Sequence, residues 1–251
     1  MKRIIVFLTT LFSLYFFILY FTDSKETNWH FVAGLLQSII AIIGALGGFI
    51  SLSGISGKMR SAIVAASVAL LAQGVSLMFW VYYVMVSGIE VPYPSLADWI
   101  LALSRIFLVI VLIVFIFIYR TNVTKYRLYF AVLLGIITGA VVYYFTGAPE
   151  ITDKASLTLV FFDVFWGIIG VITSGFAVIV LNLSGGKIMK GIRILTFGLI
   201  AVTIADLLFV FRVNRELYWN GDVSDIVLLI SIAIVSYGVI ALSESNKRIE
   251  M

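Results

Sequence analysis

The amino-acid sequence predicts an all-α integral membrane protein with eight transmembrane helices, arranged as two parallel four-helix repeats with both termini in the cytoplasm. Three observations lead to this prediction. The chain is too apolar for a soluble domain, it divides into eight long apolar stretches, and one polar pattern occurs twice, 127 residues apart.

Composition sets the class of protein. Of 251 residues, 62% are hydrophobic and only 12% are charged, whereas a soluble domain carries about 25% charged residues. The three prolines lie outside the apolar stretches, which suits uninterrupted helices. The absence of cysteine excludes thiol catalysis and iron–sulfur clusters, and the single histidine, His30, excludes a bis-histidine haem within one chain. No cofactor and no metal are expected.

The transmembrane helices follow from length. A helix needs about 20 apolar residues to cross the hydrocarbon core of a bilayer. The first stretch follows Lys2 and Arg3 like a signal peptide, but it lacks a small-residue cleavage site and is interpreted as a retained helix. The eight predicted spans are roughly 3–22, 30–52, 61–87, 99–119, 128–145, 157–183, 194–212 and 226–243.

The distribution of Lys and Arg predicts the orientation, because cytoplasmic loops carry an excess of both. Four basic residues fall on the predicted outer side, and Arg105 lies within a span. The twelve on the predicted cytoplasmic side are Lys2, Arg3, Lys58, Arg60, Arg120, Lys125, Arg127, Lys187, Lys190, Arg193, Lys247 and Arg248. The formal charge of +4 therefore forms a collar expected to contact the bilayer's anionic lipid headgroups, and no nucleic-acid partner is expected. The predicted location is the cell membrane, as a multi-pass protein.

A repeated polar pattern predicts the duplication. PYPSLADW (92–99) and WNGDVSDI (219–226) each place an acid three residues after a helix-capping residue. Ser95 and Asp98 then correspond to Asp222 and Asp225, with the first side chain capping backbone N–H groups and the acid bonding back. An even number of spans in each copy makes the repeats parallel. The predicted repeats are 1–127 and 128–251, within one compact membrane domain.

Short motifs in both halves carry a resemblance to a known family. They are Tyr93-Pro94-Ser95-Leu96-Ala97-Asp98, Phe161-Phe162-Asp163, Asp206-Leu207-Leu208-Phe209, and Gly221 with Asp225 at the start of the last helix. With these motifs the chain resembles the polytopic membrane sensor region found upstream of bacterial diguanylate cyclase (GGDEF) domains and of some sensor histidine kinases. The resemblance implies a helical membrane fold and a sensory role. Only SESNKRIEM follows the last apolar stretch where that family has an output domain, so a signal would pass to a separate partner.

Polar residues inside the spans mark the candidate site. Arg105, Asp163 and Asp206 all lie roughly 9–10 Å below the outer boundary at 1.5 Å per residue, and Gln37 reaches a similar level. Charged groups at this depth are costly. One interpretation is an ion pair between Arg105 and either acid that holds the helices together. A second is an outward-facing ligand-binding pocket that includes Gln37, and a third is that these side chains reach water without a partner.

The functional prediction is a non-catalytic sensory or scaffolding membrane module with an outward-facing polar cluster, acting through a protein partner or as a homo-oligomer. No hydrolase, nucleotide-binding or metalloprotease motif occurs, so no enzyme activity is expected. The alternatives are a small transporter or channel, favoured by parallel repeats, and a structural subunit of a larger membrane complex.

Overall fold

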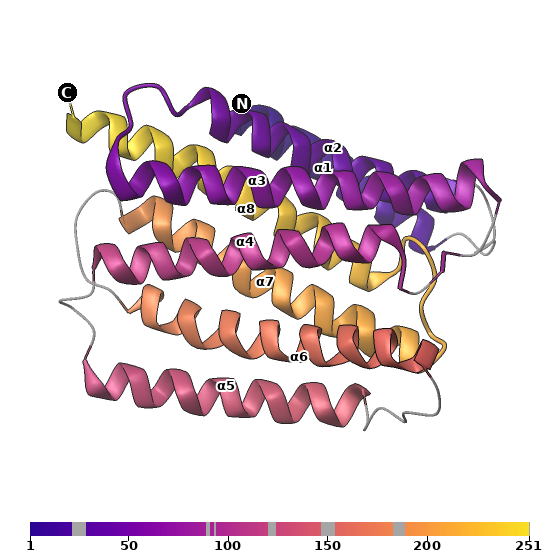
Figure 1. Ribbon diagram of the computed structural model, residues 1–251. Coiled ribbons are helices and arrows are strands. Elements are labelled where there is room, and N and C mark those ends of the chain that lie inside the picture. Colours follow the sequence, from indigo (N-terminus) through magenta and orange to yellow (C-terminus); the bar gives the residue numbers. More distant parts are fainter. Residues whose placement is uncertain are drawn as a thin grey trace.

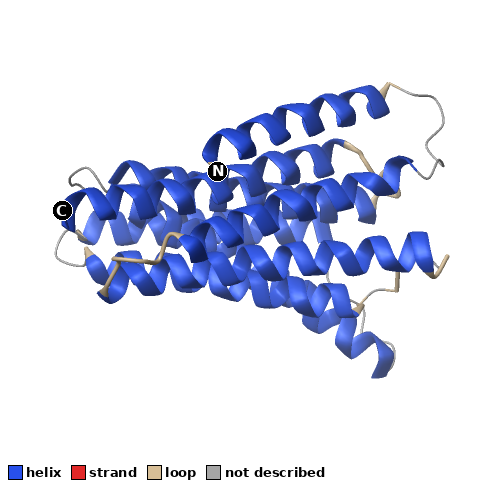
Figure 2. Cartoon of the chain, turned by 90° about the horizontal axis from the view of Figure 1, so that it is seen from above, coloured by secondary structure: helices blue, strands red, loops and turns tan. Residues whose placement is uncertain are grey.

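The computed structural model describes residues 1–21, 29–88, 91–92, 94–119, 124–146, 154–182 and 189–250. Within them the chain is helical throughout, with no β-strand, and forms a bundle of long helices running side by side (Figures 1 and 2). The helices are α1 (Lys2–Tyr20), α2 (Trp29–Ile50), α3 (Gly57–Val81), α4 (Leu96–Ile118), α5 (Lys125–Thr146), α6 (Lys154–Leu181), α7 (Met189–Asn214) and α8 (Val223–Glu250). A short π-helical segment, η1 (Tyr82–Val86), continues α3.

Seven of these helices are long and apolar enough to cross a membrane, and α5, with 22 residues, is the eighth long helix. The chain is therefore a multi-pass membrane protein, as the composition predicts. Several helices extend beyond the predicted spans. The largest extension is in α8, which continues to Glu250 through polar residues beyond the predicted end at 243, because a helix needs apolar residues only where lipid surrounds it.

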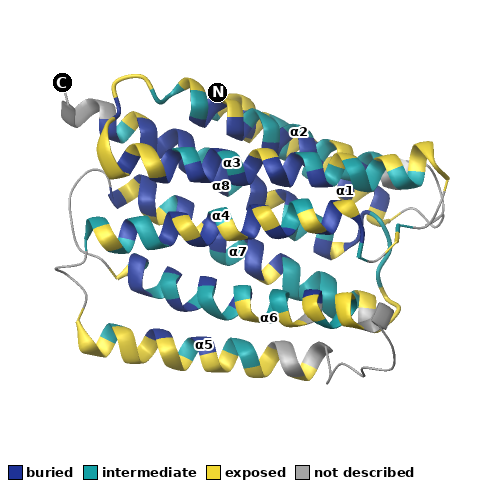
Figure 3. Cartoon of the chain, in the orientation of Figure 1, coloured by how far each residue is buried: buried dark blue, intermediate teal, exposed yellow. Residues whose placement is uncertain are grey.

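The core lies along α3 and α8, while α5 exposes most of its surface at the edge of the bundle (Figure 3). Helix α3 buries Ala62, Ala65, Ala66, Ala69 and Ala72, and these small side chains let α2 and α4 approach closely. Apart from α4 and α5, helices that are neighbours in sequence pack together, and α8 also packs against α1, α2 and α3. Helix α4 also contacts α6.

Glycines bring α7 and α8 into close contact. A Cβ atom added at Gly198 would lie 2.8 Å from the backbone nitrogen of Val235, and one at Gly238 would lie 2.7 Å from Cα of Leu195. On α2, a Cβ at Gly44 would overlap the side chain of Ser236. Small residues at helix interfaces allow this spacing in membranes, and α8 is consequently fixed against α2 and α7 along its middle.

The bundle has two distinct ends. Lys2 on α1 forms an ion pair of 2.6 Å with Glu244 on α8, so the first turn of α1 lies beside the last turns of α8. We call this the terminal end. At the opposite end α4 and α8 begin and α3 and α7 finish (Figure 1); we call this the cavity end.

Candidate functional site

A cavity of about 90 Å³ lies at the cavity end, between α2, α3, α4, α7 and α8. Leu77, Val81, Leu101 and Leu228 supply part of its apolar wall. Its polar wall is formed by Gln37, Gln73, Ser76, Asp98, Arg105, Asp206, Tyr218, Asn220, Ser224 and Asp225. Ten polar lining residues in a chain this apolar make the cavity the natural candidate for a binding site.

Arg105 forms the floor of the cavity and is almost fully buried. Its Nε and Nη2 donate to Oδ2 and Oδ1 of Asp206, both at 2.7 Å, and its Nη1 donates to Oε1 of Gln73 at 2.5 Å. This bidentate pairing is the strongest geometry that a guanidinium and a carboxylate form. The charge on α4 is thus neutralised by α7 and further satisfied by α3.

The rotation of α4 that points Arg105 inward is fixed by two serines. Ser104 Oγ donates to the backbone oxygen of Ala69, and Ser76 Oγ donates to that of Ala97, both at 2.8 Å. Both bonds join α3 to α4, and both serines are buried. Because the two bonds are seven residues apart on each helix, from 97 to 104 on α4 and from 69 to 76 on α3, they hold α4 in register with α3.

Asp98 belongs to the N-terminal cap of α4. Its Oδ2 accepts from the backbone N–H of Ser95 at 2.7 Å and from Ser95 Oγ at 2.8 Å, and the two residues form a capping box. The predicted pattern of cap and acid is therefore present at this helix start.

The start of α8 uses its two acids differently. Asp222 Oδ1 accepts from the backbone N–H of Ser224 at 2.7 Å, but Asp225 Oδ2 accepts from Gly221 N–H, also at 2.7 Å, and not from Asp222. The reason is that Asp222 N–H already donates to Trp219 O at 3.1 Å in the preceding turn. Gly221 has a φ of 96° in that turn, a conformation that glycine adopts readily.

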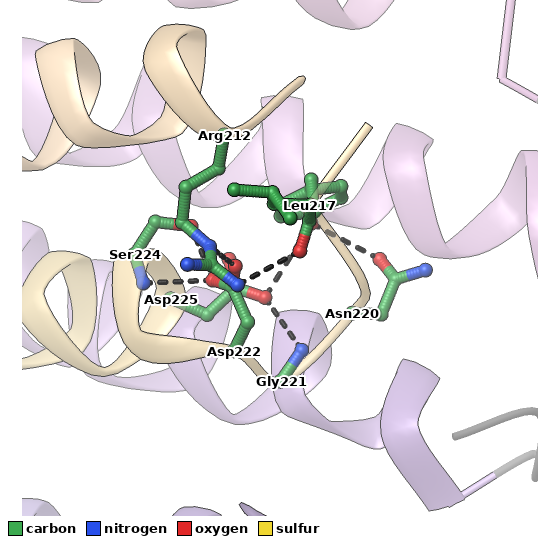
Figure 4. Close-up of polar contacts among 8 residues, drawn as sticks. Arg212, Leu217, Asn220, Gly221, Asp222, Ser224 and Asp225 are labelled. Carbon is green, nitrogen blue, oxygen red and sulfur yellow. Dashed lines mark hydrogen bonds and ion pairs between the residues drawn. The ribbon is translucent and has the colours of Figure 1, made fainter. Parts of the chain in front are cut away.

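Arg212, in the last turn of α7, secures this turn to α8 (Figure 4). Its Nε pairs with Oδ2 of Asp222, and its Nη2 donates to the backbone oxygen of Leu217 at 2.8 Å. Asp222 is completely buried, so the guanidinium compensates its charge. These two contacts hold the segment 215–222 against the end of α7 and the start of α8, at the cavity end.

Aromatic residues close the cavity beside Asp225. The ring of Phe209 makes edge contacts with Trp80, at a centroid distance of 6.2 Å, and with Tyr218, at 4.8 Å. Trp80 Nε1 donates to Asn220 Oδ1 at 3.2 Å. The Tyr218 hydroxyl lies 3.2 Å from the same oxygen and 3.4 Å from Asp225 Oδ2. Burial, together with the carboxylates of Asp225 and Asp222, raises the pKa of Tyr218 well above its usual value, so the phenol is a neutral donor.

The four residues predicted for the site separate into three groups. Arg105 and Asp206 are in direct contact, and Gln37 lines the same cavity but donates to the backbone oxygen of Asp225 at 2.9 Å. The side chain of Asp163 lies outside the described residues. Sequence reasoning did not assign Trp80, Tyr218 or Asn220 to the site, since aromatic and polar residues near a helix end are equally typical of a membrane interface.

A second cavity, of about 30 Å³, lies on the other side of the ion pair, between α4, α6 and α7. Trp166, Thr173 and Thr203 contribute to its wall, and Arg105 and Asp206 line both cavities. The ion pair is therefore a partition between two spaces.

The described residues contain no group of three or more His, Cys, Asp or Glu side chains placed to hold a metal ion. No protein-family model matches the chain, and no curated protein or solved structure is detectably similar to it.

Proposed function

We propose that this chain is a non-catalytic membrane receptor module that binds a small polar molecule in the cavity and responds by rearranging its helices. The observation that carries the proposal is the cavity itself, a polar space lined by Arg105, Asp206, Gln37 and the acids at the starts of α4 and α8. A buried polar surface is costly unless it is satisfied, and a bound ligand would satisfy it. The role agrees with the resemblance to bacterial membrane sensor regions.

The proposal places the cavity end on the outer side of the cell membrane and both termini in the cytoplasm. Support comes from the excess of Lys and Arg in the segments at the terminal end. The basic residues there would contact anionic lipid headgroups. They also offer a surface to a protein partner or to a second copy of the chain, through which the signal would pass.

We also propose that the bundle arose by duplication of a four-helix unit. Three helix contacts have a counterpart when the first four helices are matched with the last four. The contact of α3 with α4 matches that of α7 with α8. The contact of α2 with α8 matches that of α6 with α4, and the contact of α3 with α8 matches that of α7 with α4. These pairs correspond to a twofold axis along the membrane normal. The cavity would lie where the two copies of the capped helix, α4 and α8, face each other.

Close packing beyond the cavity favours reception over transport. A Cβ atom added at Gly48 would lie 2.7 Å from Cγ1 of Val239, and one at Gly191 would lie 2.7 Å from Cα of Leu242. These contacts lie in the part of α8 nearer the terminal end, so they oppose a continuous polar path along that helix. A structural subunit of a larger complex is the remaining alternative, and it does not require the cavity to be reachable.

Cysteine accessibility tests the proposal directly, because the chain has no cysteine of its own. Leu101→Cys places a thiol in the cavity, whereas Ala66→Cys places one in the packed interior, where Ala66 is fully buried. We expect a small membrane-impermeant thiol reagent to modify Leu101→Cys in right-side-out vesicles and not in inverted ones, and to leave Ala66→Cys unmodified. Modification of Leu101→Cys from the inner side would favour transport, and no modification from either side would contradict a receptor.

A further inference from the structure

We propose that the ligand of the cavity is a small organic ammonium ion, an inference that rests on the proposed receptor function and narrows it to one class of molecule. The first support is the charge of the lining. Three carboxyl groups, Asp98, Asp206 and Asp225, face the cavity together with one guanidinium, Arg105, and neither lysine nor histidine lines it. Arg105 is already paired with Asp206, and within the described residues no cation pairs with the other two carboxyl groups.

The second support is an excess of hydrogen-bond acceptors at the α8 side. Gln37 must turn its Nε2 toward the backbone oxygen of Asp225, because only the amide nitrogen donates. Its Oε1 therefore points elsewhere and accepts no hydrogen bond from the described residues, although Gln37 is only 1% exposed. The carboxyl group of Asp225 adds further acceptor oxygens: its Oδ2 accepts from Gly221 N–H, and the Tyr218 hydroxyl and the Gln37 amide lie beside the same carboxyl group. An ammonium group supplies up to three N–H donors for such oxygens.

Gln73 indicates what the other end of the ligand carries. Its Oε1 must face Arg105, because a guanidinium only donates. Gln73 is only 3% exposed, and its Nε2 has no acceptor within the described part of the chain. A hydroxyl or carbonyl oxygen on the ligand would accept from it. The amide of Gln73 thus adds a hydrogen-bond donor to a cavity that Gln37 and Asp225 line with acceptors.

The third support is the aromatic wall. Trp80, Phe209 and Tyr218 line the cavity and pack edge to face. Aromatic faces attract organic cations, more strongly where water is excluded. A cavity of about 150 Å³ accommodates the six carbon atoms of benzene, so about 90 Å³ suits a molecule of roughly four non-hydrogen atoms. The ligand is therefore a short ammonium compound rather than a bulky one.

Binding of a matched pair of probes to the full chain in lipid nanodiscs tests this inference. Ethanolammonium carries the cation and a hydroxyl group, 1-propanol has the same number of non-hydrogen atoms without charge, and potassium chloride controls for ionic strength. We expect a ligand-dependent rise in melting temperature with ethanolammonium and none with the other two. Asp225→Asn, which keeps an oxygen for Gly221 N–H, should weaken binding at least tenfold. Glu216→Gln removes the same charge from an exposed position outside the lining and should leave binding unchanged.

A rate measurement keeps the inference testable if Asp225→Asn folds poorly. In Leu101→Cys, a cationic methanethiosulfonate should react faster than an anionic one of similar size, and the ratio of the two rates should exceed the ratio in Glu216→Cys, where the position is exposed. Equal rates, or equal stabilisation by 1-propanol, would overturn the ammonium class and leave the receptor proposal standing. A thiol that reacts with neither reagent would instead overturn the receptor proposal.

Discussion

Arg105 on α4 and Asp206 on α7 form a bidentate ion pair, with both nitrogen–oxygen distances at 2.7 Å. The pair joins one helix from each half of the chain, and Gln73 on α3 binds the remaining face of the guanidinium. Because it separates two cavities, the same contact supports the fold and borders the proposed binding site.

Breaking this ion pair on one side should destabilise the protein strongly. Arg105→Leu leaves Asp206 without its cation, and removing one member of a buried pair costs about 3–5 kcal/mol. Replacing both residues by leucine should cost clearly less than the sum of the two single changes, because no unpaired charge remains. Equilibrium unfolding in detergent micelles measures all three variants.

The exposed ion pair between Lys2 and Glu244 provides the control for this cycle, since its side chains are 24% and 50% exposed. An exposed pair contributes at most about 1 kcal/mol, so Lys2→Leu should have little effect. Additive losses at Arg105 and Asp206 would show that the two residues do not stabilise each other.

The contact between α7 and α8 should not tolerate one added methyl group. In Gly238→Ala the new Cβ would lie 2.7 Å from Cα of Leu195, so the helices must separate, at a cost of about 1–3 kcal/mol. Gly170→Ala on α6 is the matched control, because the nearest atom would be 3.7 Å away. We expect a lower melting temperature for the first variant and an unchanged or higher one for the second. Equal melting temperatures would contradict the close approach.

The cap of α8 should depend on both the shape and the charge of Asp222. Asp222→Ala removes the acceptor for Ser224 N–H and should lower stability by about 0.5–2 kcal/mol from the cap alone, with a further loss from Arg212. Asp222→Asn keeps the acceptor and loses only the charge. Amide hydrogen exchange at Ser224 should therefore accelerate most in the alanine variant and less in the asparagine variant. Similar exchange in both would mean that the ion pair with Arg212 dominates.

The two ends of the chain should lie on one side of the membrane. The contact between Lys2 and Glu244 places the start of α1 beside the end of α8, and the excess of basic residues assigns that side to the cytoplasm. Epitope tags at residues 1 and 251 should both be inaccessible to antibody in intact spheroplasts and accessible after permeabilisation. Tags on opposite sides would contradict the even number of crossings.

Much of the helical pattern could be predicted from the sequence, because the cost of exposing polar backbone to lipid leaves few alternatives to apolar helices. The span predicted at 99–119 corresponds to α4, Leu96–Ile118, and the cap pattern marks its start better than hydropathy does. The end of α8 lies beyond the predicted span because hydropathy falls where lipid ends, whereas helical hydrogen bonding continues.

The pairing within the site was harder to predict. The depth in the membrane that the sequence predicts places Arg105 level with two acids, Asp163 and Asp206. Which of the two pairs with Arg105 depends on how each helix is rotated about its axis. That rotation is fixed by small contacts such as those of Ser104 and Ser76 with α3. Gln37 likewise reaches a backbone oxygen that no side-chain pattern reveals. The turn at 219–222, which shifts the hydrogen bond of Asp225 to Gly221, changes the second cap for the same local reason.

Helix α8 contains 28 residues, a length of about 42 Å, and it has a fixed point near its middle. It packs closely against α7 there, at Gly198 and Gly238, and against α2 at Gly44. The contacts of Gly48 with Val239 and of Gly191 with Leu242 hold the helix nearer the terminal end as well, so its first turns are the least constrained part. A ligand that draws Asp225 inward would therefore tilt the start of α8, while the half that carries Glu244 stays anchored.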